Sequence, residues 1–189
     1  MKSIKNNISN KIIINKSEFI CELIKVKELK EVDENIKSIK NKYKDATHYC
    51  YAYIINDKRK SSDDGEPGGT AGVPIMETLN IKDLNYILCV VIRYFGGIKL
   101  GAGGLVRAYR KAVNECLEKS EYYELVNGYQ LIIETSYDKQ TEIEQIIKDK
   151  YSKEFNEKVT YKIECNKKTK EILEQKYKII EQKEKVIEI

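Results

Sequence analysis

One apolar run followed by a cluster of glycines limits most strongly what this chain can fold into. Residues 86–95 are almost entirely apolar, which is typical of a central strand that is buried on both faces of a sheet. Residues 96–104 then contain five of the chain's ten glycines, and residues 105–119 have the apolar spacing of an amphipathic helix. The segment therefore predicts a strand, a tight glycine loop and a helix as one continuous unit.

The rest of the chain shows two further groups of strands and helices. In the first, strands are expected over 11–14, 18–26 and 48–55, helices over 28–43 and 70–80, and a polar loop over 56–70. In the second, strands are expected over 129–135, 152–156 and 159–165 and in a last segment up to 189, with helices over 141–150 and 167–177. The order along the chain is strand, helix, strand, strand, helix, strand. We therefore expect an α+β protein with one domain over residues 1–127 and a smaller ferredoxin-like domain over residues 128–189.

Composition narrows the class of protein. Of the 189 residues 41% are hydrophobic and 34% are charged, which is typical of a globular protein. A net charge of +4 is too small to indicate nucleic-acid binding by itself. The five cysteines form no CxxC motif and suggest buried thiols in a reducing compartment. No apolar stretch reaches the ~18 residues of a membrane span, and residues 1–10 lack a signal core, so we expect a cytoplasmic protein without membrane contact.

The glycine segment is the first candidate site. Glycine allows positive φ angles and a close approach between the backbone and a ligand. The helix expected from Leu105 has no Ser, Thr, Asp or Asn cap and no acid in its first turn, so its first N–H groups are available to an external anion. We expect phosphate or nucleic-acid binding by this segment and its basic side chains: Arg93, Gly96, Gly97, Lys99, Gly101, Gly103, Gly104, Arg107, Arg110 and Lys111. The alternative is a tight packing turn beside a solvated basic helix face.

An acidic loop and the only histidine form a second candidate. Asp63, Asp64 and Glu66 resemble a metal or acid–base cluster, and His48 could join them in catalysis. However, Asp-Asp-Gly is common turn chemistry, and Thr70 is a natural N-cap for the helix that follows. A structural role is therefore favoured, and we expect neither a metal site nor a cofactor.

Three tyrosines share one face of the strand expected over residues 48–55. Side chains alternate along a strand, so Tyr49, Tyr51 and Tyr53 point away from the face that holds His48. If helices covered only the other side of the sheet, the tyrosine face would be an open platform for stacking of bases. Otherwise the tyrosines fill the core or a domain interface.

Several motifs in the first domain resemble one known family. They are Ala46-Thr-His48, Ser62-Asp-Asp-Gly-Glu-Pro-Gly-Gly-Thr-Ala-Gly72, Arg93-Tyr-Phe-Gly-Gly97 and Gly103-Gly-Leu-Val-Arg-Ala-Tyr109. Their order and spacing resemble the YigZ/IMPACT family, and the length and the small second domain resemble its bacterial members. The resemblance implies a two-layer α/β sandwich like domain IV of elongation factor G, followed by a ferredoxin-like domain similar to domain V of that factor. It also implies a role near RNA or the ribosome, because such folds commonly contact RNA and nucleic-acid binding has been proposed for the bacterial members. A eukaryotic member of the family regulates translation, but its kinase-linked role does not transfer to this chain.

The chain departs from the family pattern at a few positions. Glu18 stands where the family often has arginine, which weakens any phosphate contact there. Tyr51 and Tyr53 stand where the family often has tryptophan, and tyrosine keeps a stacking face.

Three functions remain open from the sequence. The first is a non-catalytic binding protein that regulates translation through RNA, the ribosome or translation factors. The second is an enzyme that acts on a phosphorylated small molecule with His48 and the loop of Asp63, Asp64 and Glu66. That function requires a carboxylate within ~10 Å of His48. The third is a regulator that docks onto a protein through the C-terminal domain. The sequence does not fix the oligomeric state.

Overall fold

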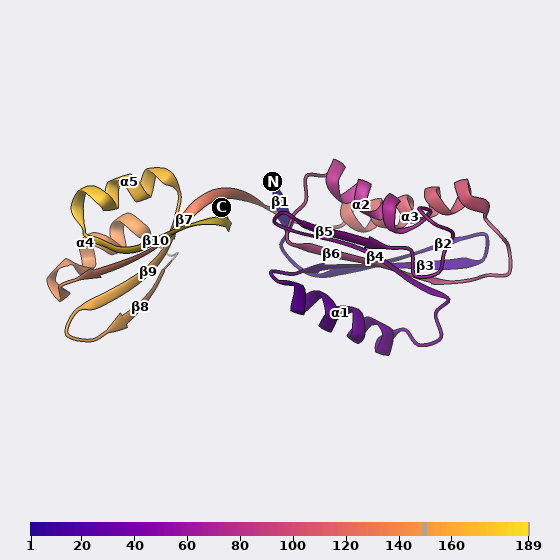
Figure 1. Ribbon diagram of the computed structural model, residues 1–189, viewed down its shortest axis with the longest axis horizontal. Helices are drawn as coiled ribbons and strands as arrows, with labels where there is room; N and C mark the ends of the chain where they lie inside the picture. The colour runs from indigo at the N-terminus through magenta and orange to yellow at the C-terminus, as the bar shows by residue number, and fades with distance from the viewer. Residues whose placement is uncertain (149–150, 189) are drawn as a thin grey trace. The chain divides into compact units, whose positions relative to one another are not determined.

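The computed structural model describes residues 1–148 and 151–188, which form two compact units. Met1–Tyr123 make up the first unit and Glu124–Ile189 the second, and β7 (Tyr122–Thr135) runs from one into the other (Figure 1). The boundary expected after residue 127 lies inside this strand. Within the described residues the chain forms two antiparallel sheets and five α-helices, which confirms the α+β class.

The first unit is built around the apolar strand. Its sheet has the order β2-β3-β6-β4-β5. The elements of the unit are β1 (Lys2–Ile4), β2 (Ile8–Ile14), β3 (Ser17–Lys25), α1 (Leu29–Lys42), β4 (His48–Ile55), β5 (Lys58–Ser62), α2 (Gly72–Ile81), β6 (Ile87–Tyr94) and α3 (Gly101–Glu118). Because β6 is paired on both sides, by β3 and by β4, it is the central strand that its apolar sequence predicts.

Helices cover both faces of this sheet. In Figure 1, α2 and α3 lie on one face and α1 lies on the other. Cys89 and Val91 of β6 belong to the core beneath α2 and α3, whereas Leu88, Val90 and Ile92 belong to the core beneath α1. The unit therefore has three layers, and the expectation of a two-layer sandwich is wrong. The physical reason is that β6 is apolar on both faces, so each face must be covered.

The tyrosine face is the one that α1 covers. Tyr49, Tyr51 and Tyr53 are each partly buried and pack against the core beneath α1. The hydroxyl of Tyr49 donates to the carbonyl oxygen of Tyr43, and the Lys40 ammonium lies 5.2 Å from the centre of the Tyr49 ring. The condition for an open stacking platform is therefore not met, and the tyrosines contribute to packing instead.

Two local elements differ from the sequence-based expectation. The polar loop expected over residues 56–70 contains β5, which pairs with β4 at the edge of the sheet. Its charged sequence is typical of edge strands, whose side chains remain in solvent. In addition, α3 begins at Gly101 rather than at Leu105, so that Gly103 and Gly104 lie inside the helix.

The second unit has the expected order of elements. After β7 come α4 (Gln140–Ile147), β8 (Tyr151–Phe155), β9 (Val159–Cys165), α5 (Lys167–Lys176) and β10 (Ile179–Glu188). Strands pair antiparallel in the order β10-β7-β9-β8. Leu131, Ile143 and Leu173 join β7, α4 and α5 in one core. Residues 149, 150 and 189, which we expected to belong to a helix and to the last strand, lie outside the described residues.

The cysteines and the helices bear on two expectations drawn from the composition, which are buried thiols and the lack of a long apolar segment. All five cysteines are free and buried, and the sulfur atoms of Cys21 and Cys89 lie 3.7 Å apart in the core of the first unit. No helix in the described part of the chain is long and apolar enough to cross a membrane.

Gly96 provides a test of the packing that positions the glycine loop. A Cβ at Gly96 would lie 2.0 Å from the carbonyl carbon of Lys16, in the turn between β2 and β3. We expect Gly96→Ala to lower the free energy of unfolding by about 1–3 kcal/mol, because backbone on both sides must shift. In Gly103→Ala the new methyl group meets only the flexible Arg107 side chain, at 3.5 Å, so this helical control should be neutral or stabilising by up to about 1 kcal/mol. Urea denaturation measures both, and equal stability of the two variants would contradict the close approach at Gly96.

Candidate phosphate-binding site

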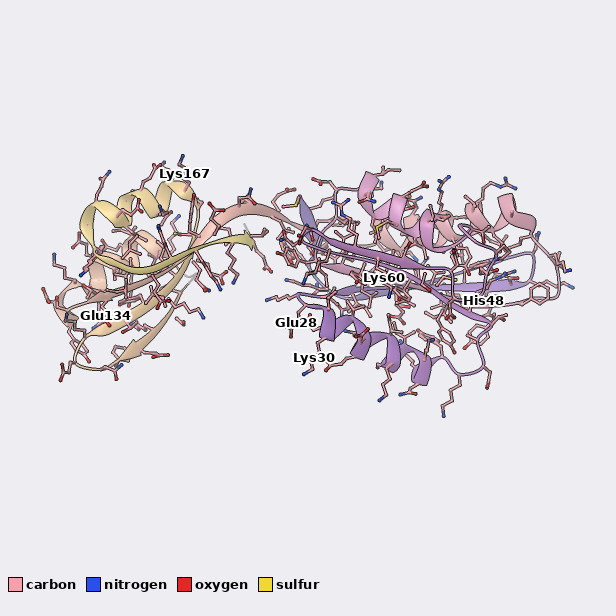
Figure 2. The ribbon with its side chains drawn as sticks, viewed as in Figure 1. Glu28, Lys30, His48, Lys60, Glu134 and Lys167 are labelled. Atoms are coloured by element: carbon pink, nitrogen blue, oxygen red, sulfur yellow. The ribbon has the colours of Figure 1, made fainter. Side chains whose placement is uncertain are left out.

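Several segments of the first unit meet at a hollow beside the start of α3, which we call the α3 hollow. It has a volume of about 450 Å³. It is lined by Thr47, His48, Glu66, Pro67, Arg93, Phe95, Lys99, Leu100, Gly101, Ala102 and Leu105. Antiparallel pairing of β4 with β6 places His48 opposite Arg93, and Figure 2 shows His48 at the end of the sheet where β6 leads toward α3. The hollow therefore combines the glycine segment with the histidine and one acid of the acidic loop.

A buried ion pair forms one wall of the α3 hollow. The Arg93 Nη1 atom lies 2.6 Å from Glu66 Oε1, and the two side chains are only 6% and 3% exposed. The Tyr109 hydroxyl, from α3, donates to the same Glu66 oxygen over 2.9 Å. Burial raises the pKa of Tyr109, and the neighbouring Cys50 thiol and Glu66 carboxylate raise it further, so Tyr109 acts as a neutral donor.

Arg93 has donors that the protein only partly uses. Its guanidinium lies between the rings of Phe19 and Phe95, at 5.4 Å and 5.5 Å from their centres. Nη2 makes a long contact of 3.5 Å with the Ser17 hydroxyl oxygen. Nε is buried and has no hydrogen-bond partner among the described residues. A buried donor without a partner costs free energy, and Arg93 is one of the residues that line the hollow.

His48 faces the hollow in a defined orientation. Its Nδ1 atom lies 2.8 Å from the carbonyl oxygen of Asp64. Because a carbonyl oxygen only accepts hydrogen bonds, we assign the proton to Nδ1, which leaves the lone pair of the neutral ring on Nε2. Nε2 lies 3.8 Å from Glu66 Oε2. A carboxylate therefore does lie within the distance that acid–base chemistry at His48 requires.

The carboxylates of Asp63 and Asp64, the other two acids of the loop, accept hydrogen bonds from backbone N–H groups. Asp63 accepts hydrogen bonds from the N–H groups of Gly69, Ala71 and Gly72, at 2.8–3.0 Å. Asp64 accepts from the N–H of Tyr49. Asp63 thus caps α2 from a distance, and the expectation that Thr70 caps this helix is wrong, because the Thr70 hydroxyl donates to the carbonyl of Pro67 instead. Within the described residues, no cluster of three His, Cys, Asp or Glu is placed to hold a metal ion.

The glycines divide into three roles. Gly97 and Gly101 have φ angles of +83° and +68°, and the space where a Cβ would lie is open at both. Gly96 packs against the turn before β3, as described above, and its N–H donates to the Ser17 hydroxyl oxygen over 3.1 Å. Gly103 and Gly104 belong to the first turn of α3. Only the first pair shows the left-handed backbone that glycine favours.

The first turn of α3 has no capping side chain. Its N-cap residue is Leu100, no acid lies in the first turn, and residues 101–103 are exposed. The available amides therefore belong to residues 101–103, and the start at Leu105 that the sequence suggested is wrong. The reason is that two glycines, which are poor helix formers, occupy helical positions.

The basic side chains differ in how far their charges are balanced. Gly103 lies beside the guanidinium of Arg107, since a Cβ there would be 3.5 Å from Nη1, so Arg107 follows α3 back toward its first turn. Arg107 and Lys99 have no ion-pair partner in the part of the chain that the structure describes. Arg110, in contrast, pairs with Glu77 of α2, and Lys111 lies 3.8 Å from Glu115. Lys99 and Arg107 are thus the available cations near the glycines.

Two functional side chains were missed by the sequence analysis. Phe95 lines the α3 hollow and is 46% exposed, and Tyr109 holds Glu66 from the helix. Tyr109 could have been found, because it shares the apolar face of its helix with Leu105 and Ala112. A tyrosine on such a face needs a buried partner for its hydroxyl.

The fold and the α3 hollow define an α+β protein that gathers a buried ion pair, a histidine and an uncapped helix start in one place. The Impact N-terminal domain family matches residues 15–117, which is more than half of the chain. The protein therefore belongs to the IMPACT family, with a further C-terminal region.

Individual relatives agree with this assignment. The IMPACT family member YvyE of Bacillus subtilis (strain 168) is 50% identical over 118 residues, which cover 61% of this chain and 54% of YvyE. YigZ of Escherichia coli (strain K12) is 40% identical over 111 residues, which cover 56% of this chain and 54% of YigZ. The matched part thus spans about half the length of these curated relatives. A crystal structure of a hypothetical protein is similar with a TM-score of 0.69 and 25% identity, over 94% of this chain and 95% of its own.

Asp63 provides a test of the loop that carries Glu66. Burial tends to raise the pKa of its carboxyl, but three backbone N–H groups outweigh that effect and hold the pKa below its usual value. We expect Asp63→Asn to lower the free energy of unfolding at pH 7 by about 0.5–2 kcal/mol, because the amide oxygen can still accept from Ala71 and Gly72 but the amide nitrogen cannot accept from Gly69, and the negative charge is lost. A depressed pKa stabilises the folded state above the unfolded pKa of ~3.9, and this contribution is lost as the pH falls through the folded value.

The difference between wild type and Asp63→Asn should therefore be full above about pH 5 and shrink toward pH 3. Urea denaturation at several pH values measures it. Asp33→Asn, at an exposed position on α1, is the matched control and should change stability little. A penalty for Asp63→Asn that stays constant down to pH 3 would contradict the capping role.

Proposed function

We propose that this protein is a non-catalytic RNA-binding protein that acts with the translation apparatus and contacts RNA phosphates at the start of α3. The observation that carries the proposal is the uncapped first turn of α3, with residues 101–103 exposed between Lys99 and Arg107. The first N–H groups of a helix and the positive end of its dipole favour anions. Two cations without partners beside them add the Coulomb attraction that phosphates require.

The fold of the second unit supports the proposed link to translation. Its strand order β10-β7-β9-β8 and its two helices support a ferredoxin-like class, similar to domain V of elongation factor G. The family resemblance adds regulation of translation for the protein. Function depends on the site more than on the fold, and the phosphate site at the start of α3 carries the proposal.

The chemistry of Glu66 favours binding over catalysis. One of its oxygens is already held by Arg93 and by the Tyr109 hydroxyl. That oxygen is occupied by two donors and is therefore not free to accept a proton from a substrate. The ion pair therefore serves to fix the wall of the α3 hollow.

RNA binding can be tested by removing the two available cations. We expect Lys99→Ala combined with Arg107→Ala to weaken binding of a 5′-hydroxyl single-stranded RNA. The slope of log K against log salt should become shallower by about 1.4, since each lost phosphate contact on a single strand is worth ~0.7. Fluorescence anisotropy over a salt series measures both quantities.

The matched control removes the same charge elsewhere. Lys30 (labelled in Figure 2) and Lys37 lie on α1, across the sheet from α3. Lys30→Ala with Lys37→Ala should therefore retain the wild-type affinity and slope. An unchanged affinity and slope in the Lys99 and Arg107 variant would reject the site.

A second candidate function is an enzyme that acts on a phosphorylated small molecule. It is favoured by the 3.8 Å between His48 Nε2 and Glu66 Oε2 in the same hollow. Because Glu66 is committed to Arg93, we expect no release of inorganic phosphate from p-nitrophenyl phosphate above background. Release that is lost in His48→Gln, measured by a molybdate assay, would replace the binding proposal with the enzyme.

A further inference from the structure

The α3 hollow contains groups that binding to an RNA backbone does not use. The first turn of α3 and Lys99 form its rim, whereas His48, Arg93 and Phe95 form its other walls. The Arg93 side chain is 6% exposed, and its buried Nε has no hydrogen-bond partner among the described residues. The hollow therefore brings an uncapped helix start together with a cation, a histidine and an exposed ring.

We propose that the α3 hollow binds a terminal phosphate, a phosphomonoester at the end of an RNA chain, with the terminal base stacked on Phe95. The inference rests on the proposed function, because it assigns a subsite within the same RNA-binding surface. It differs in substrate class, since an internal phosphodiester has no O–H group that ionises near neutral pH.

The charges around the hollow match a phosphomonoester. Such a group carries a charge of about −1.5 to −2 near neutral pH and three free oxygens. Arg93 and Glu66 balance one another, which leaves Lys99, the helix dipole and the His48 ring to face the ligand. The Asp64 carboxylate is engaged by the Tyr49 N–H and lies 3.7 Å from the Lys40 ammonium.

His48 accommodates either protonation state of the phosphate. Its Nδ1–H is held by the Asp64 carbonyl, so Nε2 is the nitrogen available to a ligand. A neutral ring accepts a hydrogen bond from a phosphate O–H, and a protonated ring donates one to a phosphate O⁻ while Glu66 Oε2 lies 3.8 Å away. A second ionisable oxygen is found only on a terminal phosphate. His48 and Glu66 together therefore distinguish the end of an RNA chain from its backbone.

Phe95 supplies a stacking surface beside the phosphate subsite. Arg93 lies 5.5 Å from the centre of the ring, and the side chain remains 46% exposed. Gly96 and Gly97 follow it and add no side chain that would cover the ring. The volume of about 450 Å³ is within the range of small-ligand pockets, about 300–1,000 Å³. One nucleotide is therefore of suitable size.

The test compares one RNA sequence with a 5′-phosphate, with a 3′-phosphate and with hydroxyl groups at both ends. Fluorescence anisotropy with the full chain at fixed salt gives the affinities. We expect one of the phosphorylated RNAs to bind about tenfold more tightly than the hydroxyl form, because charge-assisted hydrogen bonds are strong in a partly buried site. The end that gains affinity identifies the end that is recognised.

Variants separate recognition of a phosphate from general attraction to charge. In His48→Gln the preference for the phosphorylated end should disappear. Phe95→Ala changes a half-exposed residue and should also reduce the preference, so the test survives if His48→Gln fails to fold. Competition by adenosine 5′-monophosphate but not by adenosine would support the phosphomonoester and identify a free nucleotide as a second source of it.

The failures of the two proposals can be told apart. Equal affinities for phosphorylated and hydroxyl RNA, or a preference that survives both substitutions, would overturn recognition of the chain end. If hydroxyl RNA then still binds through Lys99 and Arg107, the proposed function stands without this subsite. If no RNA binds at all, both proposals fail.

Discussion

The buried ion pair between Arg93 and Glu66 is the interaction on which the site depends. Taking two charges out of water costs free energy, and the pair compensates only because the Tyr109 hydroxyl and a direct contact of 2.6 Å complete it. It joins the end of β6 to the loop before α2. That loop in turn supplies the carbonyl that orients His48 and the carboxylate that caps α2. Loss of either charge would leave the other buried without its partner, so the geometry of the α3 hollow follows from this pair.

The central strand explains the architecture of the first unit. The apolar run over residues 86–95 was correctly interpreted as β6, and the same run implies cover on both faces. The two-layer expectation came from the family resemblance and conflicted with that local signal. The structure follows the local signal, because α1 brings Val32 and Ile39 onto the second face. Tyr49, Tyr51 and Tyr53 then complete the packing beneath this helix, which is why an alternating aromatic strand did not become a stacking platform.

Local sequence rules predicted the uncapped helix start but not the contacts around it. The uncapped helix start could be predicted, since it depends only on the residues around Gly101. Which side chain caps α2 could not be predicted. Thr70 satisfies the local N-cap rule, whereas Asp63 lies 9 residues before Gly72 and reaches the helix only through the tertiary fold. Pairing of Arg110 with Glu77 is likewise a contact between two helices. Phe95 belongs to the site because the Arg93 guanidinium lies 5.5 Å from the centre of its ring. No spacing in the sequence reveals that contact.

The balance of charges indicates how such a site would recognise a ligand. With a net charge of +4 and ion pairs at Arg110 and Lys111, the protein offers little long-range attraction to a polyanion. Affinity must therefore come from a few short-range donors, namely the first amides of α3, Lys99, Arg107 and the groups in the hollow. Short-range hydrogen bonds depend strongly on the shape and protonation of the ligand, whereas Coulomb attraction depends mainly on its charge. A site built in this way favours discrimination between phosphate groups over tight, indiscriminate binding to nucleic acid.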